Sequence, residues 1–118
     1  MGPRTDREWG CFVKAERLER EFASRRVPAN GGLMLFEPAV ALALIDRAAE
    51  EGVPILGVDG CFVTDGRVES PLSHTADFSA AVAQGHGCWA DAEAFIRERG
   101  DLGLVFEVGL GDDPVEVV

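Results

Sequence analysis

The sequence predicts a single α+β domain over residues 1–118, with a mixed sheet of four or five short strands and three or four helices packed mainly on one face. Three observations support this prediction. A helical pattern runs directly into an apolar strand between residues 38 and 59, an Asp-Gly pair separates two short strand-like runs, and residues 102–110 alternate strictly between bulky and small side chains.

The segment from 38 to 59 carries the clearest pattern. Pro38 suits the first turn of a helix, where its missing N–H would have no partner, and Gly52 suits the left-handed residue that ends one. Between them the apolar residues share one side of the helix: Ala41, Leu42, Leu44, Ile45, Ala48 and Ala49. Residues 53–58 are apolar without alternation, which predicts a central or doubly covered strand.

A helix is predicted over residues 10–26, because Cys11, Ala15, Leu18 and Phe22 repeat at helical spacing. We expect this apolar stripe to pack in the core, with a partner-binding helix as the alternative. Residues 27–32 form a connector by composition, and residues 33–36 are a brief apolar run typical of a strand.

Turns and helices alternate in the second half of the chain. Asp59-Gly60 and Asp65-Gly66 are both predicted turns, the second closing a hairpin between residues 61–64 and 67–69. A short helix is expected over 75–83. A longer amphipathic helix is expected over 88–99, with Gly100 ending it.

Residues 102–110 are predicted to form a strand with one bulky buried face. The opposite face of this strand is small, which indicates either a close approach by another group or a position near a sheet edge. The last residues, 111–118, are expected to fray.

Charge is the main guide to function. The net charge is −10, but residues 1–26 sum to +2, since they hold seven basic and five acidic side chains, and residues 27–118 sum to −12, with four basic and sixteen acidic ones. This balance argues against nucleic-acid binding, which needs clustered Lys and Arg. An acidic surface either keeps a protein in solution or attracts a basic partner.

The remaining composition indicates a cytoplasmic protein with no membrane segment. No apolar run reaches the length of a membrane span, and the first residues lack the apolar stretch of a secretory signal. The odd set of Cys11, Cys61 and Cys88 is typical of reduced thiols in or near a core.

Catalytic and metal motifs are not evident, and no cofactor is predicted. Cys61, Cys88, His74 and His86 match no zinc spacing, and Ser73, His74 and Asp77 are clustered in sequence without the usual marks of a triad. Four carboxylates surround the hairpin region: Asp59, Asp65, Glu69 and Asp77. Turn chemistry explains Asp59 and Asp65, and a metal-dependent hydrolase using Asp59, Asp65, His74 and Asp77 is the enzymatic alternative.

Residues 36–110 resemble a group of small bacterial proteins, mostly uncharacterised, some described as immunity-like. The likeness is densest in Ile55-Leu56-Gly57-Val58-Asp59-Gly60 and in Ala76-Asp77-Phe78-Ser79. The matching residues look structural, so no catalytic residue is carried over. The resemblance implies a protein inhibitor, and the acidic charge fits one that blocks a basic toxin or nuclease by imitating a phosphate backbone.

We therefore expect a non-enzymatic, acidic protein-binding domain, with Asp59, Asp65, Glu69 and Asp77 as its binding residues and a protein with a basic surface as its partner. A self-associating structural protein is a further alternative. In a homodimer, the contact would be the small face of residues 102–110 or the stripe from Cys11 to Phe22.

Overall fold

The computed structural model describes residues 6–111, with side chains from residue 14 onward, and confirms an α+β domain. The helices are α1 (Asp6–Phe22), α2 (Pro38–Glu51), α3 (Ser79–Ala83) and α4 (Trp89–Glu98). Two 3₁₀ turns, Ala23–Arg25 and Leu72–His74, add to them. The strands are β1 (Leu35–Phe36), β2 (Ile55–Thr64), β3 (Arg67–Glu69), β4 (Thr75–Asp77) and β5 (Val105–Leu110).

The five strands form a sheet in the order β1-β5-β2-β3, and β4 pairs with β2 beside β3. Each of these pairings is antiparallel, so the expected mixture of parallel and antiparallel strands is wrong. The direction of pairing is not a local property, because it depends on how the chain returns after each helix. Here β3, β4 and β5 all run against β2, which makes β2 the central strand.

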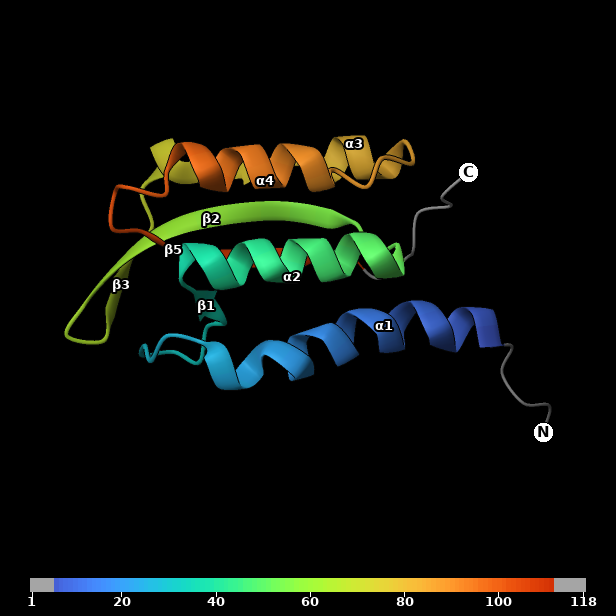
Figure 1. Cartoon of the computed structure of the whole chain (residues 1–118), viewed down its shortest axis with the longest axis horizontal. Helices are drawn as coiled ribbons and strands as arrows, with labels where there is room; N and C mark the ends of the chain where they lie inside the picture. The colour runs from blue at the N-terminus through green and yellow to red at the C-terminus, as the bar shows by residue number, and fades with distance from the viewer. Residues whose placement is uncertain (1–5, 112–118) are drawn as a thin grey trace.

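Helices cover one face of the sheet, as expected. Helix α2 lies across β5, α4 lies along β2, and α1 packs beside α2 (Figure 1). The core between these layers contains Phe36 and Phe106 from the sheet and Leu44, Ile45 and Ile96 from the helices. The other face of the sheet stays partly exposed, since alternate residues of β5 are buried and half-buried.

Helix α1 begins at residue 6, four residues before the expected start, and its end is extended by the 3₁₀ turn to Arg25. Ala15, Leu18 and Phe22 are buried in the core, which confirms that this stripe is a packing surface. Polar contacts also join α1 to α2. The Lys14 Nζ donates to the Glu51 carbonyl at 3.3 Å, and Arg47 Nε pairs with Glu21 at 3.1 Å.

The ends of α2 follow the sequence closely. Pro38 occupies the first turn, and Gly52 adopts the left-handed conformation with φ of 73°. A long-range hydrogen bond then ties α4 to the start of the central strand segment: the Trp89 indole N–H donates to the Val53 carbonyl at 2.7 Å. The helical layer and the sheet are thus joined by polar contacts as well as by the core.

One of the two expected Asp-Gly turns is wrong. Asp65 and Gly66 form the β2–β3 turn, with φ of 52° and 79°, but Asp59 and Gly60 lie in the middle of β2. Gly60 does not form a turn, and its lack of a side chain allows neighbouring residues to pack closely against β2. A Cβ at this position would lie 3.1 Å from the His74 Cβ and 3.2 Å from the Leu104 Cδ1.

The expected helix over 75–83 is wrong for its first residues, which form β4. Thr75 pairs with Asp59 and Asp77 pairs with Gly57, so the backbone of this segment forms strand hydrogen bonds with the edge of β2. The close approach depends on Gly57, because a Cβ there would lie 2.8 Å from the Ala76 carbonyl oxygen. Only residues 79–83 keep the helical conformation.

The final strand is shorter than expected, since β5 begins at Val105. A turn with Gly103 at φ of 76° precedes β5 and leaves Leu102 50 % exposed, whereas Leu104, Phe106, Val108 and Leu110 are buried. Since β5 lies between β2 and the two-residue edge strand β1, it is next to the sheet edge, which agrees with one of the two alternatives expected for its small face. Of the expected frayed tail, residues 112–118 lie outside the described residues.

The two paired glycines on β2 and β5 give a matched test of this packing. Gly57→Ala places a Cβ against backbone, so we expect it to lower the free energy of unfolding by about 1–3 kcal/mol in urea titrations. Gly109→Ala meets only ordinary contacts, at 3.7 Å and beyond, and should change it by less than about 0.5 kcal/mol. Equal losses in the two variants would contradict the assignment of Gly57 to close backbone packing.

Candidate functional site

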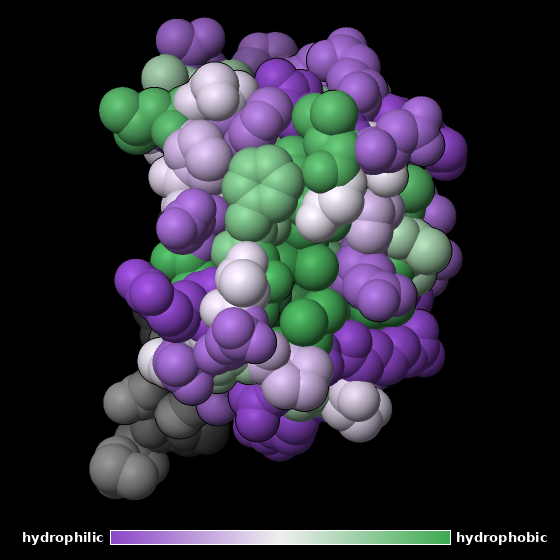
Figure 2. Space-filling model, turned by 90° about the vertical axis from the view of Figure 1, so that its left-hand side faces the viewer, coloured by the Kyte–Doolittle hydropathy of each residue, from purple (hydrophilic) through white to green (hydrophobic). Residues whose placement is uncertain are grey.

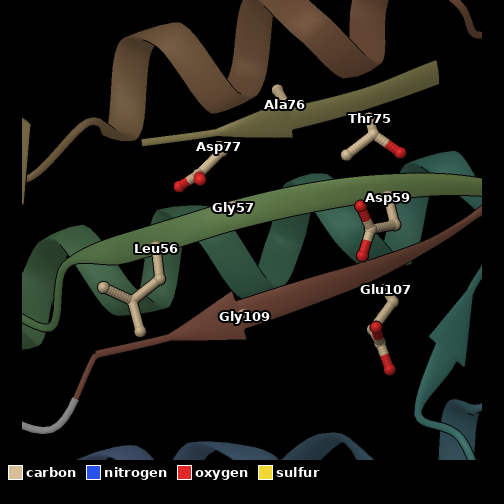
Figure 3. Close-up of a pocket in the computed structure, with 8 residues that line it drawn as sticks. All are labelled: Leu56, Gly57, Asp59, Thr75, Ala76, Asp77, Glu107 and Gly109. Atoms are coloured by element: carbon tan, nitrogen blue, oxygen red, sulfur yellow. The ribbon is translucent and has the colours of Figure 1, made fainter. Parts of the chain in front are cut away.

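The exposed face of the sheet contains a shallow hollow of about 320 Å³ (Figure 3). Its lining comes from β2, β4 and β5, which are brought together only by the sheet pairing. The residues that line it are Leu56, Gly57, Asp59, Thr75, Ala76, Asp77, Glu107 and Gly109. The hollow therefore combines glycines, carboxylates and one large apolar side chain.

Glycines form the floor of the hollow. Gly57 and Gly109 are directly paired across β2 and β5, so two neighbouring positions present backbone in place of side chains. The pairing shifts register between Ile55 and Gly57, which places Leu56 at an irregular position where it stays exposed. Such bulges re-aim side chains and are frequent beside binding sites.

Two carboxyl groups face each other at one end of the hollow. Asp59 and Glu107 are partners in the β2–β5 register, so their side chains stand on the same face of the sheet. Burial raises the pKa of Glu107, and the negative charge of Asp59 and a hydrogen bond with it raise this pKa further. Glu107 therefore holds a proton more readily than an isolated glutamate would.

Asp77, at the other end of the hollow, has hydrogen bonds that stabilise its ionised form. Its Oδ1 accepts hydrogen bonds from the Ser79 hydroxyl at 2.6 Å and from the Ser79 backbone N–H at 2.9 Å. These hydrogen bonds lower the pKa of Asp77. The same contacts fix the orientation of the carboxylate at the start of α3, so its charge has a defined position beside the hollow.

The four predicted binding residues are only partly brought together. Asp59 and Asp77 both line the hollow, whereas Asp65 occupies the β2–β3 turn and Glu69 lies on β3. The alternation of β2 places Glu69, which pairs with Phe62, on the opposite face from Asp59.

Sequence reasoning did not select Glu107. The available signal was its position as the one charged residue among the small side chains that alternate along residues 102–110.

The residues of the enzymatic alternative do not line one pocket. His74 lies on the far side of β2 from Asp59, where its ring is 6.3 Å from that of Phe62 and its Nδ1 accepts a hydrogen bond from Arg99 Nε at 3.3 Å. Within residues 14–111, no group of three or more His, Cys, Asp or Glu side chains has a geometry that could hold a metal ion. Asp59, Asp65, His74 and Asp77 are therefore not a preassembled centre.

The two described cysteines are free and buried, and desolvation raises the pKa of both Cys61 and Cys88. Such thiols are poor nucleophiles. Cys11 lies outside the residues whose side chains are described. The described helices also include none that is long and apolar enough to cross a membrane.

The positive charges of this part of the chain lie elsewhere. From residue 27 to residue 111 the sequence has four cations, all arginines. Arg47, Arg97 and Arg99 each pair with glutamates on the helices, at 2.7–3.6 Å. The fourth, Arg67, is at the start of β3, opposite Thr64 in the register of the β2–β3 hairpin. In the part of the chain that is described, no ion pair includes Asp59, Asp77 or Glu107.

A second exposed surface is apolar. Apolar side chains gather among hydrophilic ones at the end of the molecule where the loop between α4 and β5 lies (Figure 2). Leu102, in this loop, is 50 % exposed, and Leu72, in the 3₁₀ turn Leu72–His74, is 91 % exposed. This surface lacks the convergence of charge that distinguishes the hollow.

Comparison with known protein families found no family model that matches this chain, and comparison with curated proteins found no match.

The carboxyl pair predicts an unusual dependence of stability on pH. The pKa of Glu107 is higher in the folded protein than its ordinary value of 4.5, so ionising this group costs more in the folded state. Glu107→Gln should therefore raise the urea midpoint at pH 7. The gain should disappear as the pH falls below about 4.5, where Glu107 is protonated in both states.

Asp46→Asn is the matched control, because it removes one negative charge from an exposed position on α2. It measures how much a smaller net charge alone raises the urea midpoint. If the urea midpoint rises equally in the two variants at pH 7, or if the rise in Glu107→Gln persists at pH 3, the carboxyl pair does not cause the increase in stability.

Proposed function

We propose that this chain is an acidic protein-binding domain, and that it docks a basic protein on the exposed face of its sheet. Its most specific form is an immunity-like inhibitor that covers the cationic active site of a toxin or nuclease. Asp59, Asp77 and Glu107 form the centre of the proposed surface. Asp65 lies on the adjacent hairpin, and Glu69 lies on the opposite face of that hairpin. The location that fits this role is the cytoplasm.

The observation that carries the proposal is a group of three carboxylates gathered around one hollow. The helical side of the protein pairs Arg47, Arg97 and Arg99 with its glutamates, whereas the exposed sheet face presents Asp59, Asp77 and Glu107 without an ion pair in the described residues. A basic partner would supply the missing counter-charge. Complementary charge of this kind steers association and fixes the orientation of the partner.

The state of the carboxyl pair supports a binding role as well. Asp59 and Glu107 repel one another in the free protein, since burial and mutual charge raise the pKa of Glu107. A cation placed between them would relieve this repulsion. The repulsion between the two carboxyl groups destabilises the free protein, and its relief in the complex would add to the affinity.

A carboxylate surface also fits the chemistry of the proposed target. Enzymes that cut nucleic acid attract phosphates with Lys and Arg, and a protein that presents carboxylates on a firm scaffold can occupy the same positions. Here two of the three carboxylates are set by strand register and the third by hydrogen bonds from Ser79. Such a preorganised array loses little conformational entropy when it binds.

The test uses the whole protein as bait. Proteins retained on the immobilised chain at low salt are identified and purified, and the dissociation constant of each pure pair is measured by calorimetry. We expect Asp59→Asn/Asp77→Asn/Glu107→Gln to raise the dissociation constant of the true partner by about tenfold or more. The affinity should also fall between about 0.05 and 0.5 M salt. For a nuclease partner, an equimolar amount of the protein should inhibit cleavage.

The matched control is Asp46→Asn/Glu98→Gln/Asp101→Asn, which changes the net charge equally at exposed positions on the helices and the α4–β5 loop. Its affinity should stay within about twofold of wild type if the sheet face is the docking site. Asp65→Asn/Glu69→Gln measures the contribution of the hairpin to the affinity. The proposal is overturned if the sheet-face variant binds as tightly as wild type, or if both triple variants weaken binding equally.

A further inference from the structure

We infer that the hollow on the sheet face is the receptor for one arginine side chain of the partner protein, which lies over Gly109 and meets the carboxyl pair of Asp59 and Glu107. This inference rests on the proposed function and deepens it, because it names the group that anchors the partner. The argument comes from the floor of the hollow, from the positions of its charges and from its apolar end.

The floor admits a flat group. Gly57 and Gly109 are paired across β2 and β5, and the open space lies over Gly109, because a Cβ at Gly57 would lie 2.8 Å from the Ala76 carbonyl oxygen. A Cβ built on Gly109 would sit 3.7 Å from the backbone of Gly57 and 3.8 Å from the Leu56 Cβ, so a small group can lie over Gly109 in ordinary van der Waals contact. A planar guanidinium can stack on such an exposed peptide surface.

The charges lie where a guanidinium needs acceptors. Asp59 and Glu107 occupy one end of the hollow, and Asp77 occupies the other, beside Leu56 (Figure 3). A guanidinium has five N–H donors in a rigid plane and can bond two carboxylates at once. A lysine ammonium is a compact point charge that would satisfy one end and retain much of its water. The arrangement therefore favours arginine over lysine.

The remaining wall suits the aliphatic part of the same side chain. Leu56 is exposed at the irregular position of β2 and closes the end of the hollow opposite the carboxyl pair. The methylene groups of an arginine can lie along this leucine while the guanidinium reaches Asp59 and Glu107. A metal ion is a poorer occupant, because the described side chains include no group of three ligands with suitable geometry.

The first experiment needs no partner. ¹⁵N-labelled protein is titrated with N-acetyl-L-argininamide, and the amide signals of Gly57 and Gly109 are followed by NMR. We expect saturable shifts with arginine, about fivefold weaker binding with N-acetyl-L-lysinamide and none with the citrulline analogue, which has a similar shape and no charge. Equal binding of arginine and citrulline, or shifts spread over all acidic regions of the surface, would overturn the inference.

The second experiment fills the hollow without removing charge. Gly109→Val should abolish the saturable arginine shifts, with Gly109→Ala as the milder variant and urea midpoints to verify folding. In the partner assay, Gly109→Val should then weaken binding by about tenfold. If Gly109→Val binds the partner normally while Asp59→Asn/Asp77→Asn/Glu107→Gln does not, the docking face stands and the arginine anchor is wrong. If neither variant weakens binding, both proposals fail.

Discussion

The structure depends on how closely other segments can approach β2. This strand pairs with β5 along one edge and with β3 and β4 along the other, so it carries most of the sheet. The approach on the β4 side requires glycine, since a Cβ at Gly57 would meet the Ala76 carbonyl oxygen and one at Gly60 would meet His74. The two residues that let the fold close are therefore the smallest in its central strand.

The same constraint shapes the proposed docking surface. Where Gly57 of β2 pairs with Gly109 of β5, the exposed face has a floor of backbone, and the next pair along the strands is Asp59 with Glu107. One sheet register thus places an open floor and two carboxyl groups side by side. On the helical face, Arg47, Arg97 and Arg99 are held in ion pairs with glutamates of the same face, so they are not directed at the carboxylates around the hollow.

The acidic balance of the chain has a different meaning once the charges are located. A net charge of −10 spread evenly would favour little beyond solubility. Concentrated beside the hollow, three carboxylates without an ion pair in the described region create a local demand for a cation. The raised pKa of Glu107 and the lowered pKa of Asp77 show that the two ends of this surface differ in character, one strained by repulsion and the other stabilised by Ser79.

The sequence by itself determined the local elements whose signals are periodic: the helix from Pro38 to Gly52, the amphipathic helix before Gly100, the hairpin turn at Asp65-Gly66 and the buried face of β5. Only the tertiary structure decided that Asp59-Gly60 continues a strand, that residues 75–77 form β4, and that Glu107 lies opposite Asp59. Periodicity reports which face of an element is buried, whereas strand direction and register depend on contacts between segments far apart in the chain. A site assembled across three strands is a product of that register, so its composition could not be derived from any one segment.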